Sequence, residues 1–176
     1  MTATTAAKGL PGELMMWVLI FSELAVFGAG LVIFLALRIF DPDGFAHAQT
    51  ALLPALAGVN TIVLITSGYM AALAVKFPNR ARRLLIGAAL LGVMFLILKG
   101  MEFQHKADLN ITFETHDFFM FYYLLTGFHA AHVLAGVGIL LLVAKTRVPA
   151  HIQTGAAFWH MVDLVWILLF PVIYLL

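Results

Sequence analysis

The feature that most constrains the fold of this chain is a series of five apolar stretches. A helix needs roughly 20 consecutive apolar residues to cross the hydrocarbon core of a bilayer. Five stretches of about this length are separated by short connections, and they cover residues 14–39, 51–75, 84–102, 118–143 and 152–176. The chain is 63% hydrophobic and 11% charged, whereas soluble domains are about 45–50% apolar and about 25% charged. The sequence therefore predicts an all-α polytopic membrane protein, with residues 1–176 forming a single bundle of five transmembrane helices.

Basic residues are divided unevenly between the two ends of this predicted bundle. With five crossings, the N-terminus and the second and fourth connections share one side of the membrane. That side holds seven Lys and Arg residues and the other holds three, namely Lys8, Lys76, Arg80, Arg82, Arg83, Lys145 and Arg147 against Arg38, Lys99 and Lys106. Lys and Arg collect on the cytoplasmic side of membrane proteins. We therefore expect a cytoplasmic N-terminus and a periplasmic C-terminus.

Several classes of site are excluded by what the sequence lacks. It has no cysteine, which excludes disulfides, thiolate-bound metals, iron–sulfur clusters and covalently attached c-type haem. It has no phosphate-binding glycine loop, no nucleophile elbow, and no basic run long enough to suggest nucleic acid. The first apolar run is too long for a secretory signal and contains Glu23 at its centre, so we interpret it as a retained span.

Polar and ionisable side chains inside the predicted spans are the candidate functional residues. Such a group costs at least a few kcal/mol in hydrocarbon, so it should face another helix or a cavity. Depth along the helices predicts which groups meet. Glu23, Ser67 and His160 each fall roughly 14–15 Å from the cytoplasmic end, and we expect them to form one polar layer. His132 and Asp163 fall at roughly 20 Å and 18 Å, and we expect a hydrogen bond between them to form a second layer.

The chemistry of these groups has more than one interpretation. Glu23 is either a protonated carboxyl bonded to a neighbouring helix or a group that exchanges protons. Ser67 belongs to a stripe of small and polar residues that is typical of close helix packing. A haem or metal site is disfavoured, because His129 and His132 lie three residues apart on one helix. A dimetal site would also need two Glu-x-x-His pairs and further Glu residues from two other helices, and the sequence contains one such pair, Glu102 with His105.

Other positions are expected at the ends of the spans. Lys99 and Glu102 are three residues apart and predict a solvated or interfacial ion pair near the outer end of the third span. The segment "DPDG" at residues 41–44 predicts a turn, and Pro171 is expected to kink the last helix. The candidates for interfacial or lipid-associated positions are Lys99, Glu102, Gln153, Trp159 and Trp166.

Five motifs occur in the same order as in subunit III of the haem–copper oxidases, which the chain resembles over nearly its full length. They are "IFSELAVF", "NTIVLITSG", "KGMEF", "LTGFHAAHVLAG" and "FWHMVDLVWILL". The five-span form is similar to short bacterial members that lack the first two of the family's seven helices. The segment "LPGELMMWVLIFSELAVFG" is most similar to the denitrification branch, the E protein of the nitric oxide reductase cluster. One departure is Gln153, since the family usually has a Glu seven residues before the His of "WH".

The resemblance implies an accessory role in the bacterial cytoplasmic membrane. Family members pack on the haem-bearing catalytic subunit I, hold phospholipid in a cleft, and leave haem and copper to that partner. By position, Glu23 matches the family's buried carboxyl, and its helix-pairing polar network is matched by His129, His132, His160 and Asp163. We therefore expect a non-catalytic subunit of a respiratory oxidase or nitric oxide reductase.

Two alternatives come from other classes of protein. The first is a small proton-coupled transporter that uses Glu23 and the His132–Asp163 layer. Transporters often show internal repeats and helices broken near the midplane, and we find no repeat in the sequence. The second alternative, a membrane b-type cytochrome, conflicts with the spacing of the histidines.

Overall fold

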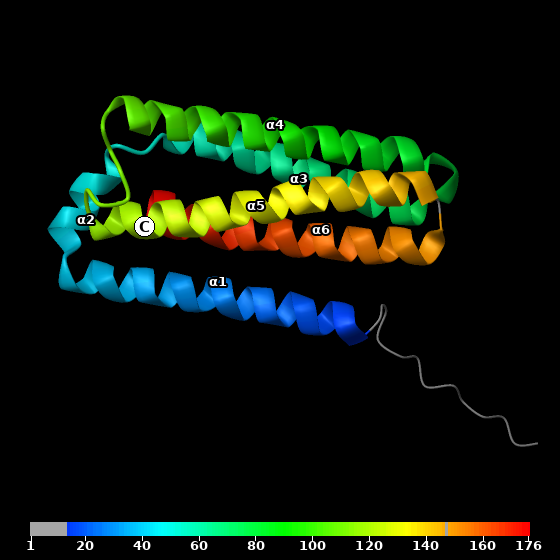
Figure 1. Cartoon of the computed structure of the whole chain (residues 1–176), viewed down its shortest axis with the longest axis horizontal. Helices are drawn as coiled ribbons and strands as arrows, with labels where there is room; N and C mark the ends of the chain where they lie inside the picture. Colours follow the sequence, from blue (N-terminus) through cyan, green and yellow to red (C-terminus); the bar gives the residue numbers. More distant parts are fainter. Residues whose placement is uncertain (1–13, 147) are drawn as a thin grey trace, which may run out of the picture.

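The structure is a computed structural model that describes residues 14–146 and 148–176. These residues form a bundle of long helices (Figure 1). Five of the described helices are long and apolar enough to cross a membrane. They are α1 (Leu14–Phe40), α3 (Pro54–Lys76), α4 (Ala81–Asp108), α5 (Asp117–Thr146) and α6 (Pro149–Phe170). The predicted all-α fold with five spans is confirmed.

Prolines set several helix boundaries. Pro54 and Pro149 stand in the first turns of α3 and α6, where a missing N–H leaves no hydrogen bond unmade. The α-helical pattern of α6 ends at Pro171, and the π-helix η2 (Pro171–Leu175) continues it. There the Leu176 N–H donates to the Pro171 carbonyl at 3.0 Å. The wider turn of η2 carries Tyr174 into the interior of the bundle.

The turn predicted at residues 41–44 is wrong, because a short helix, α2 (Pro42–Gln49), begins there. Asp41 caps this helix, and its Oδ1 accepts a hydrogen bond from the Gly44 N–H at 3.1 Å. Pro42 occupies the first turn. Asp followed by Pro is common both in turns and at helix starts. The residue types alone therefore could not decide between a turn and a helix here.

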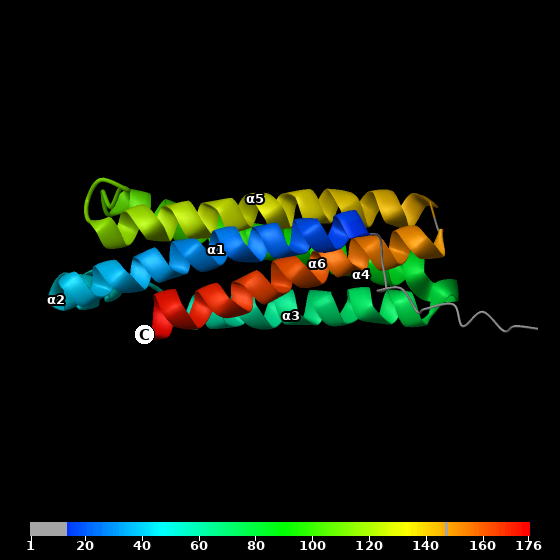
Figure 2. The same ribbon diagram turned by 90° about the horizontal axis from the view of Figure 1, so that it is seen from below.

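The helices run alternately up and down, and α1 is the least enclosed of the five spans. Figures 1 and 2 show α3, α4, α5 and α6 side by side, with α1 along one side of α5 and α6. The short helix η1 (Pro78–Arg80) joins α3 to α4. We call the end that holds η1 and the connection from α5 to α6 the inner end, and the end that holds α2 the outer end.

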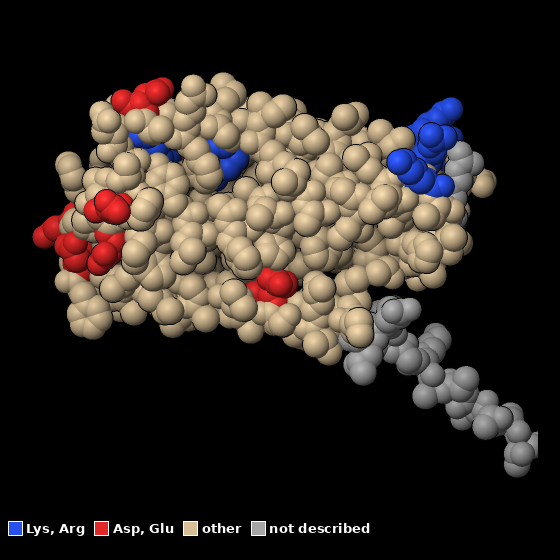
Figure 3. Space-filling model, in the orientation of Figure 1, with Lys and Arg blue, Asp and Glu red and all other residues tan. Residues whose placement is uncertain are grey.

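Acidic side chains gather at the outer end and most basic ones at the inner end, although some Lys and Arg atoms also show near the outer end (Figure 3). The inner end carries basic side chains from Lys76, Arg80, Arg82, Arg83 and Lys145, and the outer end carries acidic ones from Asp41, Asp43, Asp108, Glu114 and Asp117. Lys8 and Arg147, the other two basic residues predicted on the cytoplasmic side, lie outside the described residues. A cytoplasmic inner end remains our prediction.

Trp159 of α6 lies at the centre of the bundle and is fully buried. Its ring fits between Gly92 of α4 and Gly136 of α5, where an added Cβ would come within 2.6–2.7 Å of ring atoms. Its Nε1–H donates to the Ser67 hydroxyl of α3 at 3.0 Å, and that hydroxyl donates to the Ala88 carbonyl of α4 at 2.7 Å. One aromatic side chain therefore joins four helices, because small residues around it let their backbones approach.

Candidate functional site

The most highly charged site inside the bundle is formed by Lys99, Glu102 and Lys106 of α4, which we call the lysine cluster. The three residues are spaced i, i+3 and i+7, so they share one face of the helix. All three are at most 2% exposed. The Glu102 carboxylate lies 2.9 Å from Lys99 Nζ and 3.0 Å from Lys106 Nζ. Two ammonium groups therefore share one carboxylate in the interior of the bundle.

Aromatic residues from other elements complete the lysine cluster. Lys99 Nζ donates to the hydroxyl oxygens of Tyr122 on α5, at 3.0 Å, and Tyr174 on η2, at 2.6 Å. The Tyr174 hydroxyl also donates to the Glu102 carboxylate at 2.9 Å. The same ammonium lies 4.7–5.3 Å from four ring centres, those of Phe103, Tyr122, Trp166 and Tyr174. Aromatic faces attract cations, so these rings offset the excess positive charge of the cluster.

These contacts correct the predicted environment of four residues. Lys99 and Glu102 do pair, but they are buried rather than solvated or interfacial. Trp159 and Trp166, expected at the lipid interface, are at most 1% exposed. The physical reason is that α4 continues beyond Glu102 to Asp108, which places the pair inside the bundle where α5 and η2 cover it. Gln153 is exposed, as a lipid-facing residue would be.

Glu23 of α1 and His132 of α5 form a second contact between ionisable side chains. Glu23 Oε2 lies 3.1 Å from His132 Nε2, and both side chains are partly buried. His132 Nδ1 lies 2.9 Å from the Phe128 carbonyl oxygen. A carbonyl can only accept a hydrogen bond, so Nδ1 carries a proton and Nε2 faces the carboxyl group. The contact ties α1, the least enclosed span, to the rest of the bundle.

Both predicted polar layers are wrong in their pairings. Glu23 contacts His132 rather than Ser67 and His160, because Ser67 is occupied by Trp159 and the Ala88 carbonyl. Asp163 points to α3 instead of His132, and a Cβ added to Gly68 would collide with its carboxylate. The ionisable group nearest to Asp163 Oδ2 is His160 Nδ1, at 3.9 Å.

His129 behaves as an aromatic side chain. It is fully buried, and its ring stacks on Trp166 with centres 5.1 Å apart. The edge of Phe95 approaches it at 5.5 Å. Neither imidazole nitrogen has a hydrogen-bond partner among the described residues. Elsewhere in the described part of the chain, no three His, Asp or Glu side chains come together closely enough to hold a metal ion.

A groove of about 720 Å³ opens between α1, α3 and α6 in the half of the bundle nearest the inner end. We call it the α1–α6 groove. Its walls are mostly apolar and include Ile20, Leu24, Ala72 and Leu164. Gln153 and His160 supply polar atoms to the lining. A groove of this shape and polarity suits a hydrocarbon chain more than a charged solute.

Three residues of these sites were missed by the sequence reasoning, namely Lys106, Tyr122 and Tyr174. A signal for Lys106 was present, because it shares a helix face with Lys99 and Glu102. The tyrosines come from distant segments, so no local pattern indicates them. Their contribution depends on how α5 and η2 pack on α4.

Comparison with known proteins agrees with the motifs. The profile of the family "Cytochrome c oxidase subunit III" matches residues 9–176. Cytochrome c oxidase subunit 3 of Corynebacterium diphtheriae is 36% identical over 129 residues, which cover 66% of this chain and 63% of that protein. The subunit 3 proteins of Synechocystis sp. and Alkalihalophilus pseudofirmus are 32% and 30% identical, covering 87% and 99% of this chain and 69% and 97% of theirs. The chain thus spans less than two thirds of the first relative and nearly all of the last. Since the profile match covers almost the whole sequence, the chain belongs to the cytochrome c oxidase subunit III family.

Proposed function

We propose that this chain is a non-catalytic, subunit III-like component of a respiratory haem–copper oxidase. It packs on the haem-bearing subunit I, stabilises it, and leaves haem and copper to that partner. The observation that carries the proposal is the family match over residues 9–176. The relatives named cytochrome c oxidase subunit 3 are bacterial, which supports a place in the bacterial cytoplasmic membrane.

The geometry of the ionisable groups supports a structural role for them. The lysine cluster joins α4, α5 and η2, and the Glu23–His132 contact joins α1 to α5. Transporters commonly break their helices near the midplane to build a site. Here α1, α3, α4 and α5 are continuous, and the change in α6 comes only at Pro171. The contacts therefore favour an accessory subunit over the proton-coupled transporter.

The partner is an oxidase in this proposal, and a nitric oxide reductase is the alternative. The similarity of the first span to the denitrification branch is the observation that favours the alternative. The two differ in the catalytic subunit that would be recovered with this chain, so one purification separates them.

Affinity purification of the full chain from its own membrane tests the proposal. With a tag at the N-terminus and a mild detergent, we expect a haem-bearing subunit I to co-purify and to be identified by mass spectrometry. An untagged strain is the control. The proposal would be overturned by a Soret band or stoichiometric copper on the isolated chain, or by recovery of the tagged chain without subunit I.

We also propose that the α1–α6 groove holds a phospholipid acyl chain. Its mostly apolar walls support this, and so does the exposure of Gln153 at its polar edge. Ala72→Trp would fill the groove and should reduce the number of phospholipids that remain bound in native mass spectrometry. Ala25→Trp is the matched control, since Ala25 is exposed on α1 and does not line the groove. Equal lipid retention by both variants would contradict the proposal.

A further inference from the structure

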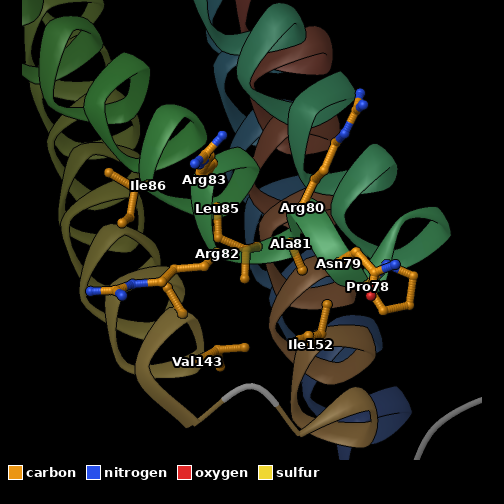
Figure 4. A pocket seen from close by; sticks show the side chains of 11 residues that line it. Pro78, Asn79, Arg80, Ala81, Arg82, Arg83, Leu85, Ile86, Val143 and Ile152 are labelled. Carbon is orange, nitrogen blue, oxygen red and sulfur yellow. The ribbon is translucent and has the colours of Figure 1, made fainter.

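A second cavity, of about 800 Å³, lies at the inner end between the start of α4 and the neighbouring ends of α5 and α6 (Figure 4). Its lining has two kinds of residue. Leu85, Ile86, Val143 and Ile152 form apolar walls, and the arginines Arg80, Arg82 and Arg83 lie at its edge. We call it the arginine cavity. It is separate from the α1–α6 groove, with which it shares no lining residue.

The three arginines are exposed, and no carboxylate of the described residues forms an ion pair with them. In Figure 4, Arg82 reaches across toward α5 beside Val143, whereas Arg80 and Arg83 extend in other directions from the start of α4. No side chain caps this helix start. The unpaired guanidinium groups and the positive end of the helix dipole together favour an anion.

The position of the cavity indicates which anion fits. It opens where the apolar spans end, so we expect it at the level of lipid headgroups, and its apolar walls continue along α4 and α5 into the spans. A guanidinium group binds phosphate through two parallel hydrogen bonds. Basic pockets between transmembrane helices on the cytoplasmic side suit anionic lipid headgroups.

We propose that the arginine cavity binds the headgroup of an anionic phospholipid. Arg82, which reaches toward α5, holds the phosphate, Arg83 adds positive charge at the edge of the cavity, and an acyl chain lies along Ile86 and Val143. This site goes beyond the oxidase assignment and does not depend on it, because the lining residues all belong to this chain.

The test is lipid titration of the full chain, purified in mild detergent and stripped of lipid, by native mass spectrometry. The probes are phosphatidylglycerol, phosphatidylcholine with the same acyl chains, and inorganic phosphate. We expect one phosphatidylglycerol to bind about 10-fold more tightly than phosphatidylcholine, because the choline cation of phosphatidylcholine neutralises its phosphate and repels the guanidinium groups. Arg82→Gln with Arg83→Gln should lose about this factor of 10.

A matched control separates the cavity from the general charge of the inner end. Lys76→Gln with Lys145→Gln also removes two positive charges at the inner end, but from residues that do not line the cavity. It should retain phosphatidylglycerol as the unchanged chain does. Ile86→Trp, which fills the cavity and keeps every arginine, should lose the lipid. It provides the test if the arginine variant does not fold.

Three results would overturn the proposal. Equal loss in the lysine control would assign the affinity to surface charge. Equal affinity for phosphatidylcholine would remove the role of the headgroup. Displacement of the lipid by inorganic phosphate at the same concentration would make the cavity a site for free anions. Co-purification with a haem protein is a separate readout, so a failure here leaves the proposed function intact.

Discussion

At the scale of single residues, Glu102 supplies the carboxylate that compensates two buried ammonium groups. It lies within 3.0 Å of two buried ammonium groups, those of Lys99 and Lys106. We expect Glu102→Gln to lower the free energy of unfolding by about 3–5 kcal/mol, because removing one partner of a buried ion pair leaves the other charge uncompensated. Thermal unfolding in detergent, followed by circular dichroism, measures this loss.

Lys106→Met is the control for that experiment. It removes one of the two cations and leaves the Lys99–Glu102 pair with its tyrosine hydrogen bonds. We expect a much smaller loss of stability than for Glu102→Gln. If the two variants unfolded at the same temperature, the carboxylate would not be the group that compensates the lysines.

Glu23 and His132 lead to a second prediction at this scale. His132 Nδ1 donates its proton to the Phe128 carbonyl, so Nε2 is the ring nitrogen that faces the Glu23 carboxyl group, 3.1 Å away. Glu23→Gln keeps an N–H donor toward Nε2 and should leave assembly of the chain unchanged. Glu23→Leu strands the imidazole nitrogen and should cost about 1–3 kcal/mol. The yield of folded chain after size-exclusion chromatography compares the two, and equal yields would contradict the pairing.

At the scale of helices, the packing around Trp159 can be tested with glycines of one helix. A Cβ on Gly136 would lie 2.6 Å from the Trp159 ring, whereas a Cβ on Gly138 would meet nothing within 4 Å. The ring cannot easily move, because it also contacts Gly92 and donates to Ser67. We expect Gly136→Ala to destabilise the bundle by about 1–3 kcal/mol through overpacking.

Gly138→Ala is the internal control, since it adds the same methyl group to the same helix. It should unfold at or above the temperature of the unchanged chain, because alanine favours the helix over glycine. Equal destabilisation of both variants would show that glycine on α5 is needed for a reason other than Trp159.

The length of the helices could be predicted from the sequence, whereas the direction of their side chains could not. The spans follow from apolar length alone, since a bilayer sets how long a helix must be. Depth arithmetic placed His132 and Asp163 at similar levels, but it does not give the direction of a side chain around its helix. His132 points to α1 and Asp163 points to α3. Figure 1 also shows that the described part of α1 begins further from the inner end than the last residues of α5 and the first residues of α6 lie, so its depth scale is offset.

At the scale of the whole molecule, the separation of charge predicts which side of the membrane each end faces. The described residues place five Lys and Arg side chains at the inner end, namely Lys76, Arg80, Arg82, Arg83 and Lys145. Positive charge on short connections is retained in the cytoplasm during insertion. Three of these five side chains, Arg80, Arg82 and Arg83, line the arginine cavity, so the predicted orientation of the chain and its proposed lipid site have a common physical origin.

Because the sequence contains no cysteine, single cysteines can report this orientation directly. Thr50 at the end of α2 and Asn79 in η1 are both exposed, and they lie at opposite ends of the bundle. With a maleimide that does not cross the membrane, Thr50→Cys should be labelled in spheroplasts and Asn79→Cys only after the cells are opened. The reverse pattern would place the arginines in the periplasm. It would then show that this charge distribution does not set the topology, and the arginine cavity would face the outer leaflet.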